Sequence, residues 1–209
     1  MKPAFAKATA GRLLIATTNP NKLREIRPLL DGLPLALLTL ADCAPMPEPE
    51  EAGGTFWENA RLKALAYASA TGELTVAEDS GLVIDALDGE PGVRSARFVS
   101  PDAPYPTRFA EIYRQLDARP AASRDARFVT ALALASGPDV LFETETAIEG
   151  WIAPAPAGAN GFGYDPIFFY APFGKTTAQL SDSEKAAVSH RARAFKDLSR
   201  FLLRSAATR

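Results

Sequence analysis

A short apolar strand that runs directly into a capped helix limits the fold of this chain more than any other feature. Leu13–Ala16 is apolar, and in the following Thr17–Pro20 segment Asn19 suits the N-cap position and the proline suits the first helical residue. Unpaired backbone N–H groups at such a terminus, the helix dipole and Lys22 one turn in would attract a phosphate group. The segment is not a Walker loop, because it lacks the glycine-rich run and the Lys-Ser/Thr pair. The alternative, which this segment taken alone favours, is an ordinary capped helix with a solvated lysine.

Size and charge restrict the class of protein. The 209 residues are 47% hydrophobic, which is enough to bury a sizeable core as one large domain or two lobes. The 23 basic and 25 acidic residues include no run of lysine or arginine, so we expect no nucleic-acid polymer as a partner. No apolar stretch approaches the roughly 20 residues of a membrane span, so we expect no membrane partner.

The residue types available restrict the metal and the compartment. Cys43 is the only cysteine, which excludes an internal disulfide and fits a reducing compartment, here expected to be the cytoplasm. With one histidine and one cysteine, a His/Cys zinc site is not expected, and any metal should be a hard ion on carboxylates, magnesium or manganese. Residues 1–11 lack an apolar signal core and are predicted to form a short extension before a single domain over 12–209.

Strand and helix patterns alternate along the first half, and an antiparallel pair of strands follows in the second half. Two capping boxes, Thr55–Glu58 and Ser181–Glu184, mark the starts of helices, the first of which should end at Gly72. The predicted helices are 20–31, 55–71, 107–118 and 182–203, and the predicted strands are 13–16, 35–40, 74–77, 82–86, 127–135, 140–148 and 167–170. This pattern predicts an α/β or mixed α+β fold of two lobes with a cleft between them.

Two acidic groups are candidates for holding a metal ion. Glu78 and Asp79 follow a predicted strand and precede Ser80-Gly81, while Glu50 and Glu51 lie in a proline-rich loop. Octahedral magnesium uses one or two carboxylates and takes phosphate oxygens and waters for the rest. Neighbours on a regular strand face opposite sides, so Glu78 and Asp79 should not both reach one ion unless the strand bends. The alternatives are a turn aspartate that caps Ser80-Gly81 and an acidic loop that is only solvated.

Two groups in the second half are candidates for ligand recognition. In Asn160–Pro166, glycines beside two aromatics would let the backbone approach a planar ligand while a ring stacks on it. The alternative is a tight turn whose aromatics fill the core. Lys185 and Ser189 share a helix face at i and i+4, whereas His190 lies far round the helix. A common site therefore requires a break near Ser189, and without one half of this group is surface charge.

Taken together and in order, these motifs resemble those of the inosine triphosphate pyrophosphatase family, whose members hydrolyse nonstandard purine nucleoside triphosphates. The resemblance covers nearly the whole chain from about Leu13. The matching stretches are Ala16–Lys22, Glu50–Ala60, Glu78–Leu82, Pro91–Arg97, Gly161–Phe168 and Glu184-Lys185 with Ser189–Arg191. Three positions depart from the family pattern: Thr18 replaces a common glycine, Glu78 a common aspartate and Arg94 an aromatic residue.

The resemblance implies an elongated α/β fold with a central mixed sheet flanked by helices, two lobes and a substrate cleft, usually in a homodimer. It implies cleavage of dITP, ITP or XTP to the monophosphate and pyrophosphate with magnesium or manganese, which cleanses the nucleotide pool. Asp79 matches the metal-binding general base, and Glu50 or Glu51 matches the acidic position that helps to place magnesium. The positions that match substrate contacts are Thr17, Thr18, Asn19 and Lys22 for the triphosphate, and Ser80, Phe162, Gly163, Tyr164, Asp165, Lys185, His190 and Arg191 for the remainder.

In the expected mechanism, Asp79 positions or deprotonates a water that attacks the α-phosphorus. Magnesium neutralises the phosphate charge, while Lys22 and the helix terminus at Asn19 hold the phosphate tail. Donors from Lys185, His190, Arg191 or backbone N–H groups of the loop would meet the 6-keto oxygen of hypoxanthine or xanthine, and adenine would leave them unpaired. Two other functions stay open, besides an α/β domain without a site, which would make every one of these motifs a coincidence. One is a septum-inhibitor-type pyrophosphatase for modified pyrimidines, whose motifs match the second half poorly. The other is a purine-nucleotide sensor that does not hydrolyse its ligand.

Overall fold

The computed structural model describes residues 11–207. The predicted extension over 1–11, except Gly11, and the last two residues of the predicted domain therefore lie outside the described residues. The chain divides into two compact units, each of which is discontinuous in sequence. Unit 1 comprises the residues up to Asp79, Thr130–Thr146 and the residues from Arg191 onward, and unit 2 comprises Ser80–Val129 and Ala147–His190.

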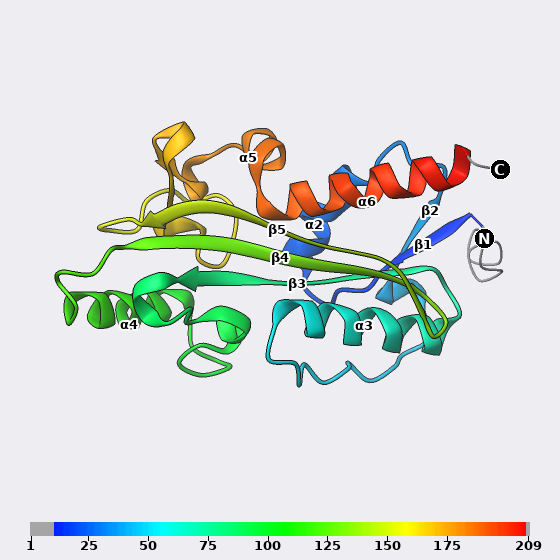
Figure 1. The fold of residues 1–209 in the computed structure, drawn as a ribbon, viewed down its shortest axis with the longest axis horizontal. Coiled ribbons are helices and arrows are strands. Elements are labelled where there is room, and N and C mark those ends of the chain that lie inside the picture. Colours follow the sequence, from blue (N-terminus) through cyan, green and yellow to red (C-terminus); the bar gives the residue numbers. More distant parts are fainter. Residues whose placement is uncertain (1–10, 208–209) are drawn as a thin grey trace. The chain divides into compact units, whose positions relative to one another are not determined.

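The strands belong to one mixed sheet in the order β2-β1-β3-β4-β5-β6-β7 (Figure 1). β1 pairs in parallel with β2 and β3, whereas β6 pairs antiparallel with β5 and β7. The strands are β1 (Arg12–Ile15), β2 (Ala36–Thr39), β3 (Thr75–Ile84), β4 (Asp125–Ser136), β5 (Asp139–Ile152), β6 (Phe168–Tyr170) and β7 (Lys175–Thr176). The helices are α2 (Pro20–Leu29), α3 (Phe56–Thr71), α4 (Tyr105–Asp117), α5 (Asp182–Val188) and α6 (His190–Ala207). The predicted α/β fold with a central mixed sheet flanked by helices is confirmed.

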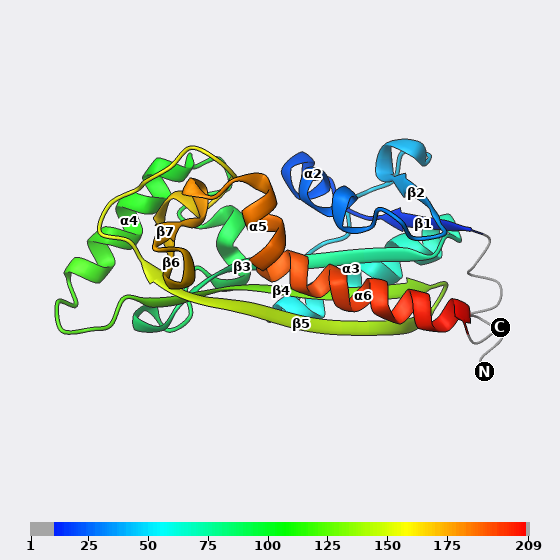
Figure 2. The same cartoon turned by 90° about the horizontal axis from the view of Figure 1, so that it is seen from above.

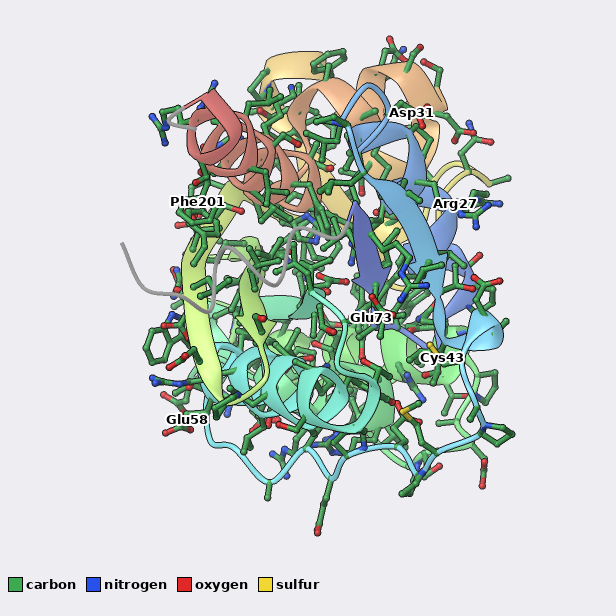
Figure 3. The ribbon with its side chains drawn as sticks, turned by 90° about the vertical axis from the view of Figure 1, so that its right-hand side faces the viewer. Arg27, Asp31, Cys43, Glu58, Glu73 and Phe201 are labelled. Atoms are coloured by element: carbon green, nitrogen blue, oxygen red, sulfur yellow. The ribbon has the colours of Figure 1, made fainter. Side chains whose placement is uncertain are left out.

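In unit 1, helices cover both faces of the strands. Helices α2 and α6 lie on one face and α3 on the other, as the view from above and the end-on view both show (Figures 2 and 3). On the first face, Ile15 of β1, Ile26 of α2 and Phe195 of α6 are buried in one apolar cluster. On the other face, Ala64 and Ala68 of α3 are fully buried. Such small side chains let a helix lie close to the strands that it covers.

The core of unit 2 gathers around α4. Phe109 and Ile112 of this helix are buried with Ile84 of β3, Ile152 of β5 and Phe168 of β6 in a second apolar cluster. The amphipathic pattern predicted for 107–118 thus corresponds to the inward face of a real helix. The cluster places the loop before β6 against α4, which matters for the site described below.

Caps confirm the predicted starts of α2 and α3 and the predicted end of α3, whereas the single helix predicted over 182–203 is divided into α5 and α6. The Asn19 side chain accepts hydrogen bonds at the start of α2, and Thr55 and Glu58 form the predicted capping box at the start of α3. Gly72 ends α3 in the left-handed region with a φ of 70°. Ser189 adopts an extended backbone between α5 and α6, so the break on which a shared Lys185–His190 site depended is present.

The prediction of two separate strands at 74–77 and 82–86 is wrong, because β3 runs without interruption from Thr75 to Ile84. The polar Glu78–Gly81 segment resembles a turn, but it stays extended within the sheet. Gly81 is required for close packing rather than for a turn. A Cβ atom there would collide with the Ser95 hydroxyl and lie 2.7 Å from the Gly92 carbonyl oxygen, both in the 3₁₀ helix η3 (Gly92–Arg97).

We expect Gly81→Ala to lower the free energy of unfolding by about 1–3 kcal/mol, since the added methyl group forces η3 away from β3. Chemical denaturation of the two proteins measures the difference. Gly54→Ala is the matched control, because a Cβ atom at Gly54 lies at an ordinary 3.6 Å from Glu58 and should change stability by less than about 0.5 kcal/mol. Equal stability of the Gly81→Ala and control proteins would contradict the packing role.

Candidate active site

The turn between β1 and α2 is held by its own side chains. Thr17 Oγ1 accepts a hydrogen bond from the Asn19 backbone N–H at 3.2 Å. Asn19 Oδ1 accepts from the backbone N–H groups of Asn21 at 2.9 Å and Lys22 at 3.2 Å. The prediction that these N–H groups are unpaired is therefore wrong, because an N-cap side chain and a bound anion compete for the same donors. The helix dipole and the Thr17 hydroxyl remain available to attract an anion, and Lys22 adds a positive charge that also pairs with Glu78.

Glu78 lies on one face of β3 and forms ion pairs with two cationic side chains. Its carboxylate is 4% exposed and its Oε1 lies 3.1 Å from both Lys22 Nζ and Arg191 Nη2. Arg191 also pairs with Glu25 of α2. Burial alone would raise the pKa of Glu78, but the charges of Arg191, Lys22 and Lys63 outweigh it and hold that pKa well below its usual range. Glu78 is therefore ionised at neutral pH and holds α2 and α6 to β3 through its ion pairs.

Asp79 faces the opposite side of the same strand, as the strand period predicts. Its Oδ2 accepts a hydrogen bond from Asn59 Nδ2 at 3.1 Å, and its Oδ1 lies 3.4 Å from Lys63 Nζ. Burial raises the pKa of Asp79 despite the opposing charges of Lys63 and Lys22, and the Glu51 carboxylate adds to the rise. Two neighbouring carboxylates are thus given different proton affinities, and Asp79 is the better proton acceptor.

A hard metal ion fits the oxygen donors around Asp79. Lys63 Nζ is 2.6 Å from a Glu51 oxygen and also pairs with Asp79, so two carboxylates already converge on one cation. Magnesium needs one or two carboxylates and completes its octahedron with water and phosphate oxygens. Residues 11–207 contain no cluster of three or more His, Cys, Asp or Glu side chains suited to a metal, so the remaining ligands would come from substrate and solvent. Of the two acidic loop positions, Glu51 lies in this group while Glu50 is exposed.

In unit 2, Asp165 closes the glycine-rich loop. This carboxylate is 2% exposed and accepts hydrogen bonds from Lys185 Nζ, from Thr177 Oγ1 at 2.8 Å and from the Phe162 backbone N–H at 2.7 Å. Lys185 Nζ lies 5.2 Å from the centre of the Phe162 ring, in cation–π geometry. The loop therefore sets an aromatic ring and an ammonium group side by side.

The other predicted residues of the second half have separate surroundings. Tyr164 is buried and its hydroxyl donates to the Ser95 carbonyl at 2.9 Å, so this aromatic fills the core while Phe162 is partly exposed. The His190 ring stacks on Phe128 at 4.9 Å with an interplanar angle of 15°. Arg191 belongs to the Glu78 group described above. The structure thus joins Lys185 to the loop but gives His190 and Arg191 partners of their own.

Three further predicted residues lie beside these groups. Thr18 Oγ1 donates to Glu48 of the proline-rich loop at 3.1 Å. Ser80 is half-buried on β3 next to Asp79. Gly163 has a φ of 66°, and a Cβ atom there would lie 3.6 Å from the Tyr105 hydroxyl.

Sequence reasoning missed Asn59 and Lys63, which hold Asp79 from α3. A signal was present, because the two residues are spaced i and i+4 and put polar groups on the face of an alanine-rich helix that covers the sheet. Both are buried in the structure. Glu25, the second partner of Arg191, has no comparable signal, since a glutamate on a half-exposed helix is usually solvated.

The site thus combines a mixed sheet, two buried carboxylates that face opposite sides of β3 and a capped helix terminus. Known proteins share the family and the fold of this chain. The model of the Ham1 family matches residues 13–201, and the chain belongs to this family. Membership confirms the family assignment made from the sequence motifs. In the part of the chain that the structure describes, no helix combines the length and apolarity that crossing a membrane requires.

Individual relatives agree in sequence and in fold. A dITP/XTP pyrophosphatase from Geobacter sulfurreducens is 46% identical over 183 residues, which cover 88% of this chain and 92% of the relative. The structure of a HAM1 protein from Coxiella burnetii has a TM-score of 0.86 at 37% identity and covers 92% of this chain and 98% of its own. The structure of a nucleoside-triphosphatase / dITP/XTP pyrophosphatase from Mycobacterium abscessus has a TM-score of 0.71 at 41% identity, and the match covers 90% of this chain and 98% of that chain.

The Glu78 group predicts how stability depends on pH. Because the folded-state pKa of Glu78 is lowered, its stabilising contribution is complete above the unfolded value of about 4.3 and is lost as the pH falls through the folded value. We expect Glu78→Gln to cost about 3–5 kcal/mol at pH 7, since Arg191 and Lys22 lose a buried partner, and to flatten the fall in stability below about pH 4.3.

Denaturation curves recorded from pH 7 to pH 3 measure both effects. Glu145→Gln is the control, because Glu145 is an exposed glutamate of β5. An acid slope in Glu78→Gln as steep as that of the parent protein would contradict the assignment.

Proposed function

We propose that this chain is a nucleoside-triphosphate pyrophosphatase that cleaves nonstandard purine nucleotides, dITP, ITP and XTP, to the monophosphate and pyrophosphate. Membership of the Ham1 family and the names of the relatives in Geobacter and Mycobacterium support this proposal. The observation that carries it is Asp79, a buried carboxylate whose pKa is raised and whose two oxygens are oriented by Asn59 and Lys63. A module that only senses a nucleotide has no need of a carboxylate prepared to accept a proton, so the sensor alternative is not favoured.

In this mechanism Asp79 orients a water and takes its proton as the water oxygen attacks the α-phosphorus. One water O–H bond breaks, a new P–O bond forms, and the bond from the α-phosphorus to the bridging oxygen breaks to release pyrophosphate. In the metal-free site the raised pKa makes Asp79 a more basic carboxylate than Glu78, which suits this role. The reaction requires positioning and charge neutralisation rather than a covalent intermediate, which agrees with the lack of a nucleophile motif in the sequence.

The phosphate tail is assigned to the turn before α2. Lys22 supplies a positive charge one turn into a helix whose N-terminal dipole also favours anions, and Glu78 holds that lysine in place. The Thr17 hydroxyl adds a donor to the same turn, since its oxygen only accepts from the Asn19 N–H, whereas the Thr18 hydroxyl already donates to Glu48. Magnesium, when bound by Asp79 with Glu51, would neutralise phosphate charge and polarise a phosphoryl oxygen.

The base is assigned to the loop closed by Asp165. The partly exposed Phe162 ring offers a stacking surface, and Lys185 offers an ammonium group beside it that suits the 6-keto oxygen of hypoxanthine or xanthine. Adenine carries an amino group at that position and would leave a buried donor unpaired at a cost of about 1–3 kcal/mol. The sequence resemblance supports action as a homodimer, and the single cysteine supports a reducing compartment such as the cytoplasm. The near-neutral charge balance and the lack of a long apolar stretch favour a small nucleotide over a nucleic-acid polymer or a membrane as partner.

The first experiment supplies the purified protein with magnesium and, in separate reactions, dITP, XTP, dGTP, dATP and dTTP, and assays pyrophosphate and orthophosphate. We expect pyrophosphate from dITP and XTP and little from the others. Orthophosphate as the direct product would place the attack at the γ-phosphorus and contradict the mechanism. Binding of dITP without any turnover would favour the sensor.

Asp79→Asn tests the general base. We expect kcat for dITP to fall by about 10²-fold or more while the affinity for dITP is retained, because the amide keeps the shape of the carboxylate and cannot accept the proton. Single-turnover kinetics and a calorimetric titration measure the two quantities. In the parent enzyme, kcat/KM should fall on the acid side through a pKa above the ordinary aspartate value of about 3.9. Unchanged turnover in the variant would remove Asp79 from this role.

The two acidic loop positions provide a matched pair for the metal. We expect Glu51→Gln to raise the magnesium concentration that gives half-maximal activity by about tenfold, whereas Glu50→Gln should leave it nearly unchanged. Magnesium titrations at saturating dITP measure this difference. A larger effect in Glu50→Gln would assign the metal to the other carboxylate.

A further inference from the structure

A buried arginine outside the groups described above occupies the centre of unit 2. Arg108 of α4 is 3% exposed. Its Nη1 donates to the Ser95 carbonyl at 3.2 Å, and its Nη2 donates to the carbonyls of Ser100 at 3.2 Å and Pro101 at 3.1 Å. No carboxylate pairs with it in the part of the chain that the structure describes, and its Nε has no hydrogen-bond partner there. A buried charge compensated by carbonyl dipoles alone is costly and therefore needs an explanation.

The three carbonyl groups lie on both sides of a strained residue. Val99 is a β-branched residue with a φ of 72°, in the left-handed region that such residues avoid. A backbone strain of this kind persists only where the surroundings hold it. Arg108 contacts Ser95 before Val99 and Ser100 and Pro101 after it. The guanidinium group thus ties together the two ends of the strained segment.

The Phe162–Asp165 loop rests on this segment through Tyr164. The Ser95 carbonyl that accepts from Arg108 also accepts from the Tyr164 hydroxyl, at 2.9 Å. Ser95 itself is attached to β3, because its Oγ accepts from the Leu82 backbone N–H at 3.0 Å. The carbonyl is therefore a shared anchor for the arginine and for the loop.

A second route from Arg108 to the loop runs through Tyr105. The guanidinium carbon lies 4.8 Å from the centre of the Tyr105 ring. That ring meets Tyr164 edge-on, with centroids 5.3 Å apart and an interplanar angle of 89°. The Tyr105 hydroxyl lies 3.6 Å from the position of a Cβ atom at Gly163. Two of the four loop residues are thus supported by groups that Arg108 contacts directly.

We infer that Arg108 is a positioning residue for base recognition: through the Ser95 carbonyl and the Tyr105 ring it fixes Gly163 and Tyr164, and with them the Phe162 ring on which the purine stacks. This inference rests on the proposed function and deepens it, because it assigns a determinant of base selectivity. A guanidinium is suited to the task, since its planar fork reaches three carbonyls while one face lies on an aromatic ring. A lysine would keep the charge but lose the fork and the stacking.

The test compares the parent enzyme with Arg108→Lys and Arg108→Met in steady-state kinetics on dITP and dATP. We expect KM for dITP to rise about tenfold in Arg108→Lys with kcat within about twofold, because the variant loosens the base loop and leaves the Asp79 group intact. The preference for dITP over dATP, as a ratio of kcat/KM values, should fall in both variants. Arg114→Met is the control on the same helix, because Arg114 is exposed and pairs only at the surface with Glu111.

A double-variant cycle keeps the test decisive if Arg108→Met does not fold. Tyr164→Phe removes the loop's own hydrogen bond to the Ser95 carbonyl, so its effect on the KM for dITP should be non-additive with that of Arg108→Lys. A lower melting temperature with unchanged KM and unchanged dITP/dATP preference would show a merely structural arginine and overturn the inference, while the proposed function would stand. A parent protein that cleaves neither nucleotide would overturn both.

Discussion

The burial of two adjacent carboxylates on β3 is the constraint on which unit 1 depends. Neither Glu78 nor Asp79 can be ionised in the interior without nearby cations or donors, because removing a charge from water costs several kcal/mol. The strand period sends them to opposite faces, so each face must supply its own compensation. Lys22 of α2 and Arg191 of α6 serve Glu78, and Lys63 of α3 serves Asp79. Three helices are thereby tied to one pair of neighbouring residues.

The different surroundings of the two carboxylates shift their pKa values in opposite directions. Glu78 receives two close cations, which overcome the effect of burial and lower its pKa, so it cannot act as a base near neutral pH. Asp79 receives one lysine that it shares with Glu51 and one neutral amide, and burial then prevails and raises its pKa. The two roles follow from the surroundings, since the side chains differ by one methylene group.

The features that could be predicted from the sequence are those encoded within a few residues. The caps of α2 and α3 and the opposite facing of Glu78 and Asp79 each depend on local geometry, and the structure has all of them. The break at Ser189, which the sequence left open, is also present. The continuity of β3 could not be predicted, because the polar Glu78–Gly81 segment within it has the composition of a turn. The pairing of Glu78 with Arg191 could not be predicted either, because the two residues are 113 positions apart. Local reasoning also failed at Asn19, whose side chain occupies the donors left open for phosphate.

Unit 2 contains two buried cations, Lys185 and Arg108, whose charges are compensated by different kinds of group. Lys185 is neutralised by Asp165, so its ammonium group sits in a polar cluster at the loop whose Phe162 ring is partly exposed. Arg108 is surrounded instead by carbonyl oxygens and a tyrosine ring, all of which belong to the scaffold behind that loop. The first arrangement suits direct contact with a base and the second suits rigidity, because carbonyl groups of a strained backbone cannot follow a ligand. Discrimination between a keto oxygen and an amino group requires donors held in place before the base arrives. The proposed base recognition would therefore depend on the scaffold as much as on the residues that touch the base.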